Sequence, residues 1–234
     1  MASDVTYEVQ GRGYTGYLAD GSGGKPSPGV LVIHEANGLG DHARKKADML
    51  AEAGYVAFAA DLYGEVADTL DDAMKLAGPL MTDPDELRTR CKGALDVLRR
   101  QSNVDSSRLA AIGFCFGGSA ALELGRSGAD LRAIVGFHSG LKTSRPEDTA
   151  AVRAKLLLCL GDADPLISGE VRDAFMDNVR EAKLDAQMVL YSGVGHSFTN
   201  PEAERFGVAG CHYDVTADRR SWAAMRALFD EVFA

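Results

Sequence analysis

The sequence predicts an α/β fold built on a mostly parallel, doubly wound sheet with helices on both faces. From residue 30 onward, uninterrupted apolar runs of five or six residues alternate with amphipathic stretches. Such runs are typical of strands that are buried on both faces, as in a parallel sheet covered by helices. The repeated order of strand and helix is that of a doubly wound sheet.

Two short strands are expected before this alternation begins. Residues 5–10 and 13–19 flank a glycine-containing turn, which predicts an N-terminal antiparallel hairpin. A loop rich in Gly, Ser and Pro follows at 20–29. Its Lys25 is followed by Pro26, whereas a phosphate-binding loop needs Ser or Thr after the lysine and a strand before its glycines. The loop is therefore a connection and no nucleotide site.

The remaining elements follow in order along the chain. Further strands are expected at 30–34, 55–60, 109–114, 131–137, 155–161 and 186–191, and helices at 42–53, within 68–100, at 118–126, at 168–183 and from about 216. The stretch 65–80 places Val66, Leu70, Met74 and Ala77 on one helical face and its acids on the other. This pattern predicts that the acidic side is solvated.

Length and composition limit the kind of protein. The 234 residues fit one domain spanning 1–234, and a hydrophobic content of 46% is that of a globular chain. A net charge of −9 argues against a nucleic-acid partner, which requires clustered Lys and Arg. No signal peptide or apolar run long enough to span a membrane is present, so we expect a cytoplasmic protein that binds no membrane. The pattern leaves monomer and homodimer open.

A cysteine lies at the turn between an expected strand and the next helix. In RLAAIGFCFGG, residues 108–118, Cys115 is flanked by Gly113 and Gly117. Small neighbours allow a strand and a helix to approach at a sharp turn, and the helix N-terminus favours a thiolate. A buried structural cysteine is the alternative, but packing alone does not require the glycines. Cys115 is therefore a candidate nucleophile.

A base and an orienting acid follow in the order used by α/β-hydrolases. Asp162 and Asp164 come after the expected strand 155–161, and His196 comes after the last strand. Each thus follows the carboxyl end of a strand, where open α/β sheets bind ligands. Asp164 is preferred as the acid, because Asp162 directly follows Gly161 and is better placed to form the turn. Together they predict an α/β-hydrolase fold.

Five motifs make residues 29–234 resemble the dienelactone hydrolase family, whose members are cysteine-dependent α/β-hydrolases. The motifs are GFCFGG, GDADPLIS, GHSF, VIHEANGL and the tripeptide DLY at 61–63. The resemblance implies that Cys115 is the nucleophile, His196 the base and Asp164 the orienting acid. It also implies that Glu35 contacts the cysteine in the resting enzyme and is displaced by substrate. The alternative for Glu35 is a loop acid that caps the following helix.

Two backbone amides and two side chains complete the predicted site. The oxyanion hole is expected to use the N–H groups of Ala36 and Phe116. Tyr63, in the DLY tripeptide, and His138, at the end of strand 131–137, are candidate substrate contacts. His138 is expected at the mouth of the pocket or, equally, on the surface.

No metal or cofactor is expected. His34, Glu35 and His42, with His138 or Cys115, lack HxxxH or HExxH spacing. The other thiols are Cys91 and Cys159, read as core, and Cys211, for which a functionless loop position and a second reactive thiol stay open.

These residues predict hydrolysis of a small ester or lactone through a cysteine thioester. Dienelactone itself is in doubt, because the arginines that the family uses for the substrate carboxylate are absent: DLY continues with Gly64–Glu65, and GHSF with Thr199–Asn200. Arg12, Arg145 and Arg205 are possible substitutes. The competing class is a thiol-based redox or ligand-binding protein without turnover, for which Cys115 would suffice.

Overall fold

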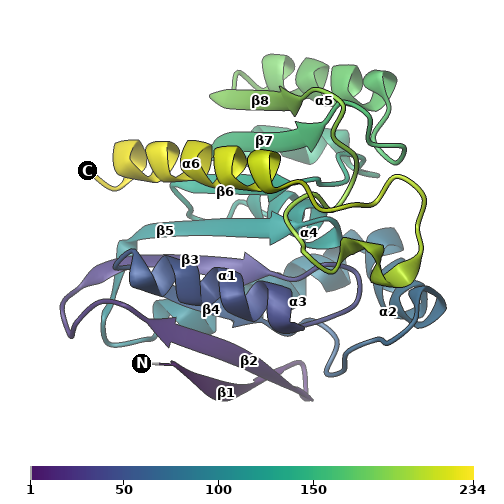
Figure 1. Cartoon of the computed structure of the whole chain (residues 1–234). Helices are drawn as coiled ribbons and strands as arrows, with labels where there is room; N and C mark the ends of the chain where they lie inside the picture. Colours follow the sequence, from purple (N-terminus) through teal and green to yellow (C-terminus); the bar gives the residue numbers. More distant parts are fainter. Residues whose placement is uncertain (1) are drawn as a thin grey trace.

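The structure is a computed structural model that describes residues 2–234, and within that range it contains one eight-stranded sheet (Figure 1). The strand order is β1-β2-β4-β3-β5-β6-β7-β8. The pairs β1–β2 and β2–β4 are antiparallel, and all other pairs are parallel. The predicted α/β-hydrolase fold, with its N-terminal hairpin, is confirmed.

All the predicted strands and helices are present. The strands are β1 (Ala2–Val9), β2 (Arg12–Asp20), β3 (Ser27–Ile33), β4 (Val56–Ala60), β5 (Val104–Phe114), β6 (Ala133–Phe137), β7 (Lys155–Gly161) and β8 (Ala186–Tyr191). The α-helices are α1 (Asp41–Glu52), α2 (Leu70–Thr82), α3 (Pro84–Arg99), α4 (Phe116–Arg126), α5 (Gly169–Glu181) and α6 (Val215–Val232), with short 3₁₀ helices η1 (Pro146–Ala151) and η2 (Ala203–Phe206).

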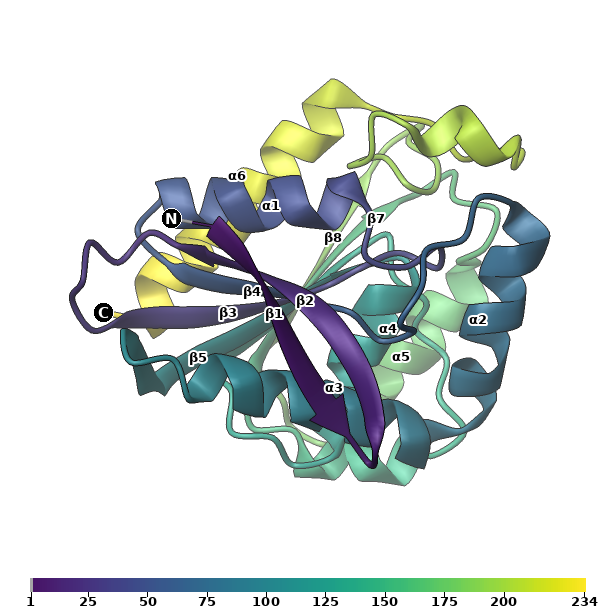
Figure 2. The same ribbon diagram turned by 90° about the horizontal axis from the view of Figure 1, so that it is seen from below.

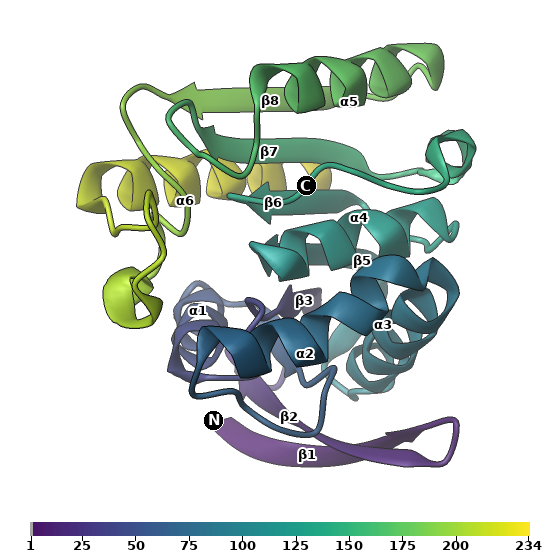
Figure 3. The same cartoon turned by 90° about the vertical axis from the view of Figure 1, so that its right-hand side faces the viewer.

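The helices form a layer on each face of the sheet. Helices α1 and α6 cover one face, and α3, α4 and α5 cover the other (Figures 1 and 2). Helix α2 lies on the same side as α3, as the turned view shows (Figure 3). In residues 2–234 no helix combines the length and apolarity needed to cross a membrane.

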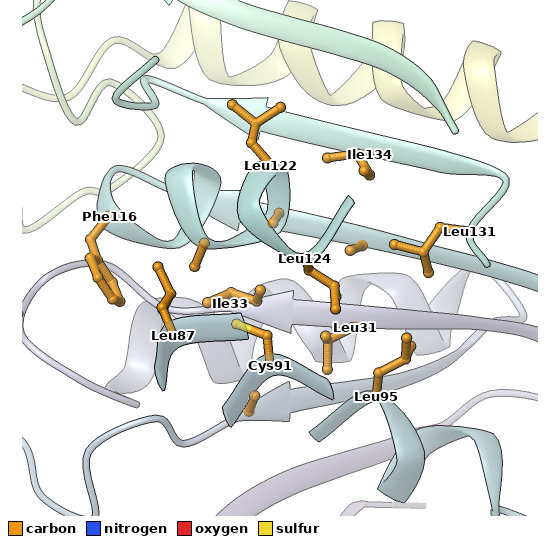
Figure 4. Packing of buried hydrophobic residues seen from close by; sticks show 14 of the residues in the cluster. Leu31, Ile33, Leu87, Cys91, Leu95, Phe116, Leu122, Leu124, Leu131 and Ile134 are labelled. Atoms are coloured by element: carbon orange, nitrogen blue, oxygen red, sulfur yellow. The ribbon is translucent and has the colours of Figure 1, made fainter. Parts of the chain in front are cut away.

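The central strands are buried on both faces because successive side chains enter different cores. In β3, Leu31 and Ile33 join the core beneath α3 and α4, whereas Val30 and Val32 join the core beneath α1 and α6. Figure 4 shows Cys91 on α3 pointing into the first core among leucines. This double burial explains why these strands appear in the sequence as continuous apolar runs.

Two local expectations are wrong. Strand β3 begins at Ser27, inside the expected loop, because a register shift between Pro28 and Gly29 lets the chain pair with β5 earlier. On α2, the buried side chains are Ala73, Ala77 and Leu80, whereas Leu70 and Met74 are exposed. The small alanines let α2 pack closely against the protein. The buried face of α2 therefore differs from the face that the sequence pattern predicts.

The parallel strands bring four loops to one edge of the sheet. The loops that follow β3, β5, β7 and β8 all leave from the carboxyl ends of the strands, and they carry Glu35, Cys115, Asp164 and His196. The fold therefore gathers residues that are far apart in the sequence.

The turn between β5 and α4 requires glycine at two positions. A Cβ atom at Gly113 would lie 2.0 Å from the carbonyl oxygen of Gly117, and one at Gly117 would lie 2.2 Å from the carbonyl oxygen of Ile33. These contacts are between backbones, so no side-chain movement could relieve them. The close approach sets where α4 begins relative to β3.

Gly117→Ala is expected to lower the free energy of unfolding by about 3 kcal/mol, because the added methyl group must push α4 away from β3. Gly78→Ala is the matched control. It lies in the open interior of α2 with nothing within 4 Å, and should raise the free energy of unfolding by about 0.5–1 kcal/mol. Urea denaturation measures both, and a Gly117→Ala protein as stable as the native one would contradict the packing argument.

Candidate active site

Cys115 occupies the turn between β5 and α4, directly before the helix. Its backbone has φ +52° and ψ −116°, a sparsely populated conformation for a residue with a side chain, which costs about 1–3 kcal/mol. The Cys115 N–H donates to the Phe137 carbonyl at 3.0 Å, and the Cys115 carbonyl accepts from the Gly118 N–H at 3.1 Å. The half-buried thiol thus lies at a helix N-terminus, where the dipole favours negative charge.

His196 and Asp164 form a buried hydrogen-bonded pair. The Nδ1 atom of His196 lies 2.7 Å from Oδ2 of Asp164, and the two residues are 3% and 5% exposed. The other carboxylate oxygen of Asp164 accepts the N–H of Leu166 at 2.8 Å. Asp162 instead accepts the N–H of Gly193 at 2.5 Å in the neighbouring turn. Asp164 is thus the aspartate that contacts the imidazole.

On the opposite side of its ring, His196 is affected by the charge of Cys115. With Nδ1 bound to Asp164, Nε2 is the nitrogen left for the sulfur, and it has no partner of regular geometry within residues 2–234. Burial alone would lower the pKa of His196, but the charge of Cys115 and the hydrogen bond with Asp164 raise it to about 11. The site therefore favours the protonated form of the His196 imidazole.

The two predicted oxyanion donors, Ala36 and Phe116, belong to neighbouring elements of the fold. Phe116 is the first residue of α4, so its N–H has no acceptor inside the helix. Ala36 belongs to the loop after β3, and β3 is packed against the start of α4 through the contact of Gly117 with Ile33. The elements that carry both amides are therefore adjacent, and their role stays a prediction.

Glu35, whose side chain is 11% exposed, is bound by the loop that follows β8. Asn200 Nδ2 donates to Glu35 Oε2 at 2.5 Å, and His42 Nδ1 lies 3.5 Å from the same oxygen. Burial raises the pKa of Glu35, while the Asn200 hydrogen bond and the charge of His196 oppose the rise. Among residues 2–234 no hydrogen bond joins Glu35 to Cys115. The resting contact with Cys115 that the resemblance implies stays a prediction.

Tyr63 is buried next to the turn. Its ring lies 4.7 Å from that of His34 and 5.6 Å from that of Phe116, between centroids. The hydroxyl has no hydrogen-bond partner among the described residues, and burial, followed by the charge of Cys115, raises the pKa of Tyr63. Tyr63 stays a candidate substrate contact, and its free hydroxyl is its most unusual feature.

The position that the sequence predicts for His138 is wrong. Its side chain is fully buried, so it lies neither at a pocket mouth nor on the surface. Nε2 is 2.8 Å from the hydroxyl of Thr199, and the ring meets that of His196 edge-on at 5.2 Å. The segment after His196 folds over the end of β6 and covers this residue. His138 therefore supports the His196 ring from behind.

A cavity of about 360 Å³ lies beside Glu35. Its lining includes Glu35, His42, Asn200 and Arg205. The guanidinium of Arg205 pairs with Asp68 at 2.9 Å. Arg205 is thus the one candidate arginine that borders this cavity.

The other two candidate arginines have partners of their own. Arg145 forms a bidentate pair with Asp85, each contact 2.7 Å, and Arg12 donates to the Tyr63 carbonyl. Neither borders the cavity described above.

The remaining thiols divide into two kinds. Cys91 and Cys159 are fully buried, as predicted, and burial raises the pKa of each to about 12. Cys211 is half-buried and forms a β-bridge with His196. Burial raises the pKa of Cys211, and the charges of His196 and Cys115 also act on it. It therefore borders the site.

Sequence reasoning missed the residues that surround Glu35 and His138. Thr199 and Asn200 directly follow the GHSF motif, where the sequence indicates only that an arginine is missing. Their position in the loop of the predicted base was the available signal. Within residues 2–234 no group of three or more His, Cys, Asp or Glu side chains is arranged to hold a metal ion.

The fold, together with a thiol at the strand–helix turn and a buried His–Asp pair, defines a protein of the α/β-hydrolase class. The family model described as the dienelactone hydrolase family matches residues 14–233, and the chain belongs to this family. Its enzyme class is the predicted one, a carboxylic ester hydrolase.

Three relatives illustrate the similarity. The solved structure named m3DLH shares 45% identity and a TM-score of 0.96, covering 100% of this chain and 99% of its own. P91, a dienelactone hydrolase-like promiscuous phosphotriesterase from metagenomic libraries, shares 40% identity and a TM-score of 0.94, covering 99% and 98%. A putative carboxymethylenebutenolidase of Methylorubrum extorquens is 28% identical over 85% of this chain and 72% of its own.

His196 is expected to stay protonated well above pH 6.5, its ordinary value, and to lose its proton only as the pH approaches about 11. The stabilisation linked to this raised pKa is complete below pH 6.5 and is lost as the pH rises toward 11. Cys115→Ser should lower the pKa of His196, because a serine hydroxyl carries no negative charge. NMR of the imidazole nitrogens distinguishes the two proteins, and titration near 6.5 in both would contradict the paired charges.

Proposed function

We propose that the protein hydrolyses a small ester or lactone through a thioester on Cys115, with His196 as the base and Asp164 as its orienting acid. The observation that carries this proposal is the buried 2.7 Å hydrogen bond between His196 Nδ1 and Asp164 Oδ2, which leaves Nε2 without a partner among the described residues. The charge of Cys115 also raises the pKa of His196, which supports the pairing of the imidazole with the sulfur. A redox thiol would not require a buried His–Asp pair.

The first half of the reaction forms the acyl-enzyme. The Cys115 thiolate attacks the carbonyl carbon, and the amides of Ala36 and Phe116 stabilise the resulting oxyanion, each contributing about 3 kcal/mol. The imidazolium of His196 then gives its proton to the leaving oxygen. In a lactone that oxygen stays attached to the acyl group, so the ring opens on the enzyme.

Water completes the cycle. Neutral His196 removes a proton from the water that attacks the thioester, and the thiolate leaves. Asp164 accepts from Nδ1 throughout, so Nε2 is always the nitrogen that exchanges protons with the reacting groups. The buried carboxylate also favours the imidazolium that forms in each step.

The substrate class follows from the missing arginines. With Gly64–Glu65 and Thr199–Asn200 where the family has carboxylate-binding arginines, a neutral lactone, simple ester or thioester fits better than dienelactone. Arg205, at the edge of the cavity, is already paired with Asp68.

A neutral phosphotriester is a second candidate substrate. P91, at 40% identity, is described as a promiscuous phosphotriesterase, and such a substrate needs no carboxylate-binding arginine. A phosphotriester therefore belongs in the substrate panel beside the carboxylic esters.

Cys115→Ala and His196→Ala are expected to lower turnover of p-nitrophenyl acetate about 10³-fold or more, because nucleophile and base act as one unit. Quenching the native enzyme during turnover should trap one acyl group on Cys115, detected by peptide mass spectrometry. A lactone, a thioester and a neutral p-nitrophenyl phosphotriester complete the panel.

Asp164→Asn should lower kcat about 10⁴-fold through the wrong imidazole tautomer, whereas the neighbouring Asp162→Asn is the matched control and should keep most activity. Turnover that survives loss of Cys115 would remove the assignment. A native protein that turns over no member of the panel, yet is oxidised at Cys115, would favour the redox alternative.

A further inference from the structure

His34 is a fully buried histidine that directly follows β3. Its ring lies edge-on to the ring of Tyr63, 4.7 Å between centroids, and stacks with the ring of Phe116 at 6.2 Å. Its backbone carbonyl oxygen would be 2.5 Å from a Cβ atom at Gly117. His34 therefore lies where the loop after β3, the loop after β4 and the start of α4 meet.

Two backbone groups determine which nitrogen of His34 carries the hydrogen. The N–H of Leu62 donates to Nε2 at 3.2 Å, so Nε2 must be bare. Nδ1 lies 2.6 Å from the carbonyl oxygen of Glu35, an atom that can only accept, so Nδ1 carries the hydrogen and donates it. Burial lowers the pKa of His34, although the Glu35 carbonyl and the charge of Asp61 oppose this effect. The ring is therefore neutral and protonated on Nδ1.

The Glu35 carbonyl and the Ala36 N–H belong to one peptide unit. A peptide unit is planar, and all those in residues 2–234 are trans, so the N–H points in the direction opposite to the C=O. The carbonyl oxygen accepts from Nδ1 of His34 and, at 3.2 Å, from the backbone N–H of Gly38. The Ala36 N–H must therefore face away from both donors. Holding the oxygen in place fixes the direction of this N–H.

The Ala36 N–H is free to bind a ligand. Within the described chain, 2–234, neither a carbonyl oxygen nor a side chain accepts it, and Ala36 is only partly buried. A donor that is already oriented stabilises a developing negative charge without any cost of reorganisation. The Gly38 bond closes only the local turn, whereas the His34 ring is itself held by Leu62 from another loop. His34 is thus the group that ties this peptide unit to the rest of the fold.

We propose that His34 is a positioning residue for the oxyanion hole: its Nδ1–H holds the Glu35 carbonyl, and this orients the Ala36 N–H toward the substrate oxygen. The inference rests on the proposed function in taking Ala36 as an oxyanion donor. The same ring stacks with Phe116, which carries the second predicted donor, so one side chain contacts the elements of both amides.

Two substitutions of His34 test the proposal in turnover of p-nitrophenyl acetate. His34→Phe keeps a ring between Tyr63 and Phe116 but donates nothing to the Glu35 carbonyl, so it should lower kcat and kcat/KM equally, about 10²-fold. In His34→Asn the side-chain Nδ2 takes the position of Nδ1 and can still donate, so kcat should stay within about tenfold of the native value. Both variants leave the Leu62 N–H without its acceptor.

The two variants also separate positioning from stability. Phenylalanine fills the space of the imidazole, whereas asparagine leaves a cavity, so His34→Asn should have the lower free energy of unfolding in urea denaturation. A purely structural role would make His34→Asn the less active variant. Positioning makes it the more active one.

Arg90→Met is the matched control. The Arg90 guanidinium donates to the Leu62 carbonyl at 2.7 Å, so its loss loosens the same loop after β4 without removing a donor from the Glu35 carbonyl. The kcat of this variant should stay within about threefold of the native value.

Imidazole ¹⁵N NMR of the native protein tests the tautomer without any substitution or substrate. His34 should carry its hydrogen on Nδ1, leave Nε2 bare and show no titration between about pH 5 and pH 9. This measurement keeps the inference testable even if a variant does not fold.

Three results would overturn the inference. One is a His34 ring with its hydrogen on Nε2. The second is a His34→Phe protein with native kcat, although Cys115→Ala abolishes turnover. The third is a His34→Asn protein no more active than His34→Phe, which would mean that the ring acts only through packing or through Leu62. Turnover that survives Cys115→Ala would instead remove the proposed function, so the two failures are distinct.

Discussion

The candidate site depends on the close approach of three backbone segments. Gly113 and Gly117 let the end of β5, the start of α4 and the end of β3 meet at distances that leave no room for a Cβ atom. This contact fixes the turn that carries Cys115 and brings the loop with Glu35 and Ala36 to the same place. The proposed nucleophile, the two predicted amide donors and the Glu35 carboxylate thus share one short stretch of the sheet edge because two residues lack side chains.

Most of the fold could be predicted because the strands are buried on both faces, which leaves continuous apolar runs in the sequence. The prediction failed where burial depends on the size of side chains. On α2 the alanines face the core and Leu70 and Met74 face outward, a choice that periodicity cannot make. His138 was misplaced for a related reason, because the segment that buries it is distant in sequence.

In the candidate site too, some positions could be predicted from the sequence and others could not. Cys115, Asp164 and His196 each directly follow a strand, so the topology alone predicts that they meet at one edge. The contacts of Thr199 with His138 and of Asn200 with Glu35 depend on how an irregular loop folds, and Ser197 within it has a left-handed backbone at φ +54°. No periodic pattern describes such a loop. The sequence could therefore predict Cys115, Asp164 and His196 as candidate site residues, but not the loop contacts made by Thr199 and Asn200.

The backbone at Cys115 has a consequence for how this protein could change over time. Its conformation suits glycine far better than any residue with a side chain, so the chain gives up folding free energy to keep sulfur at that position. A descendant that no longer needed the thiol would become more robust by a single replacement with glycine. Relatives in which glycine replaces this cysteine should therefore arise easily, and they should have a higher free energy of unfolding than this protein.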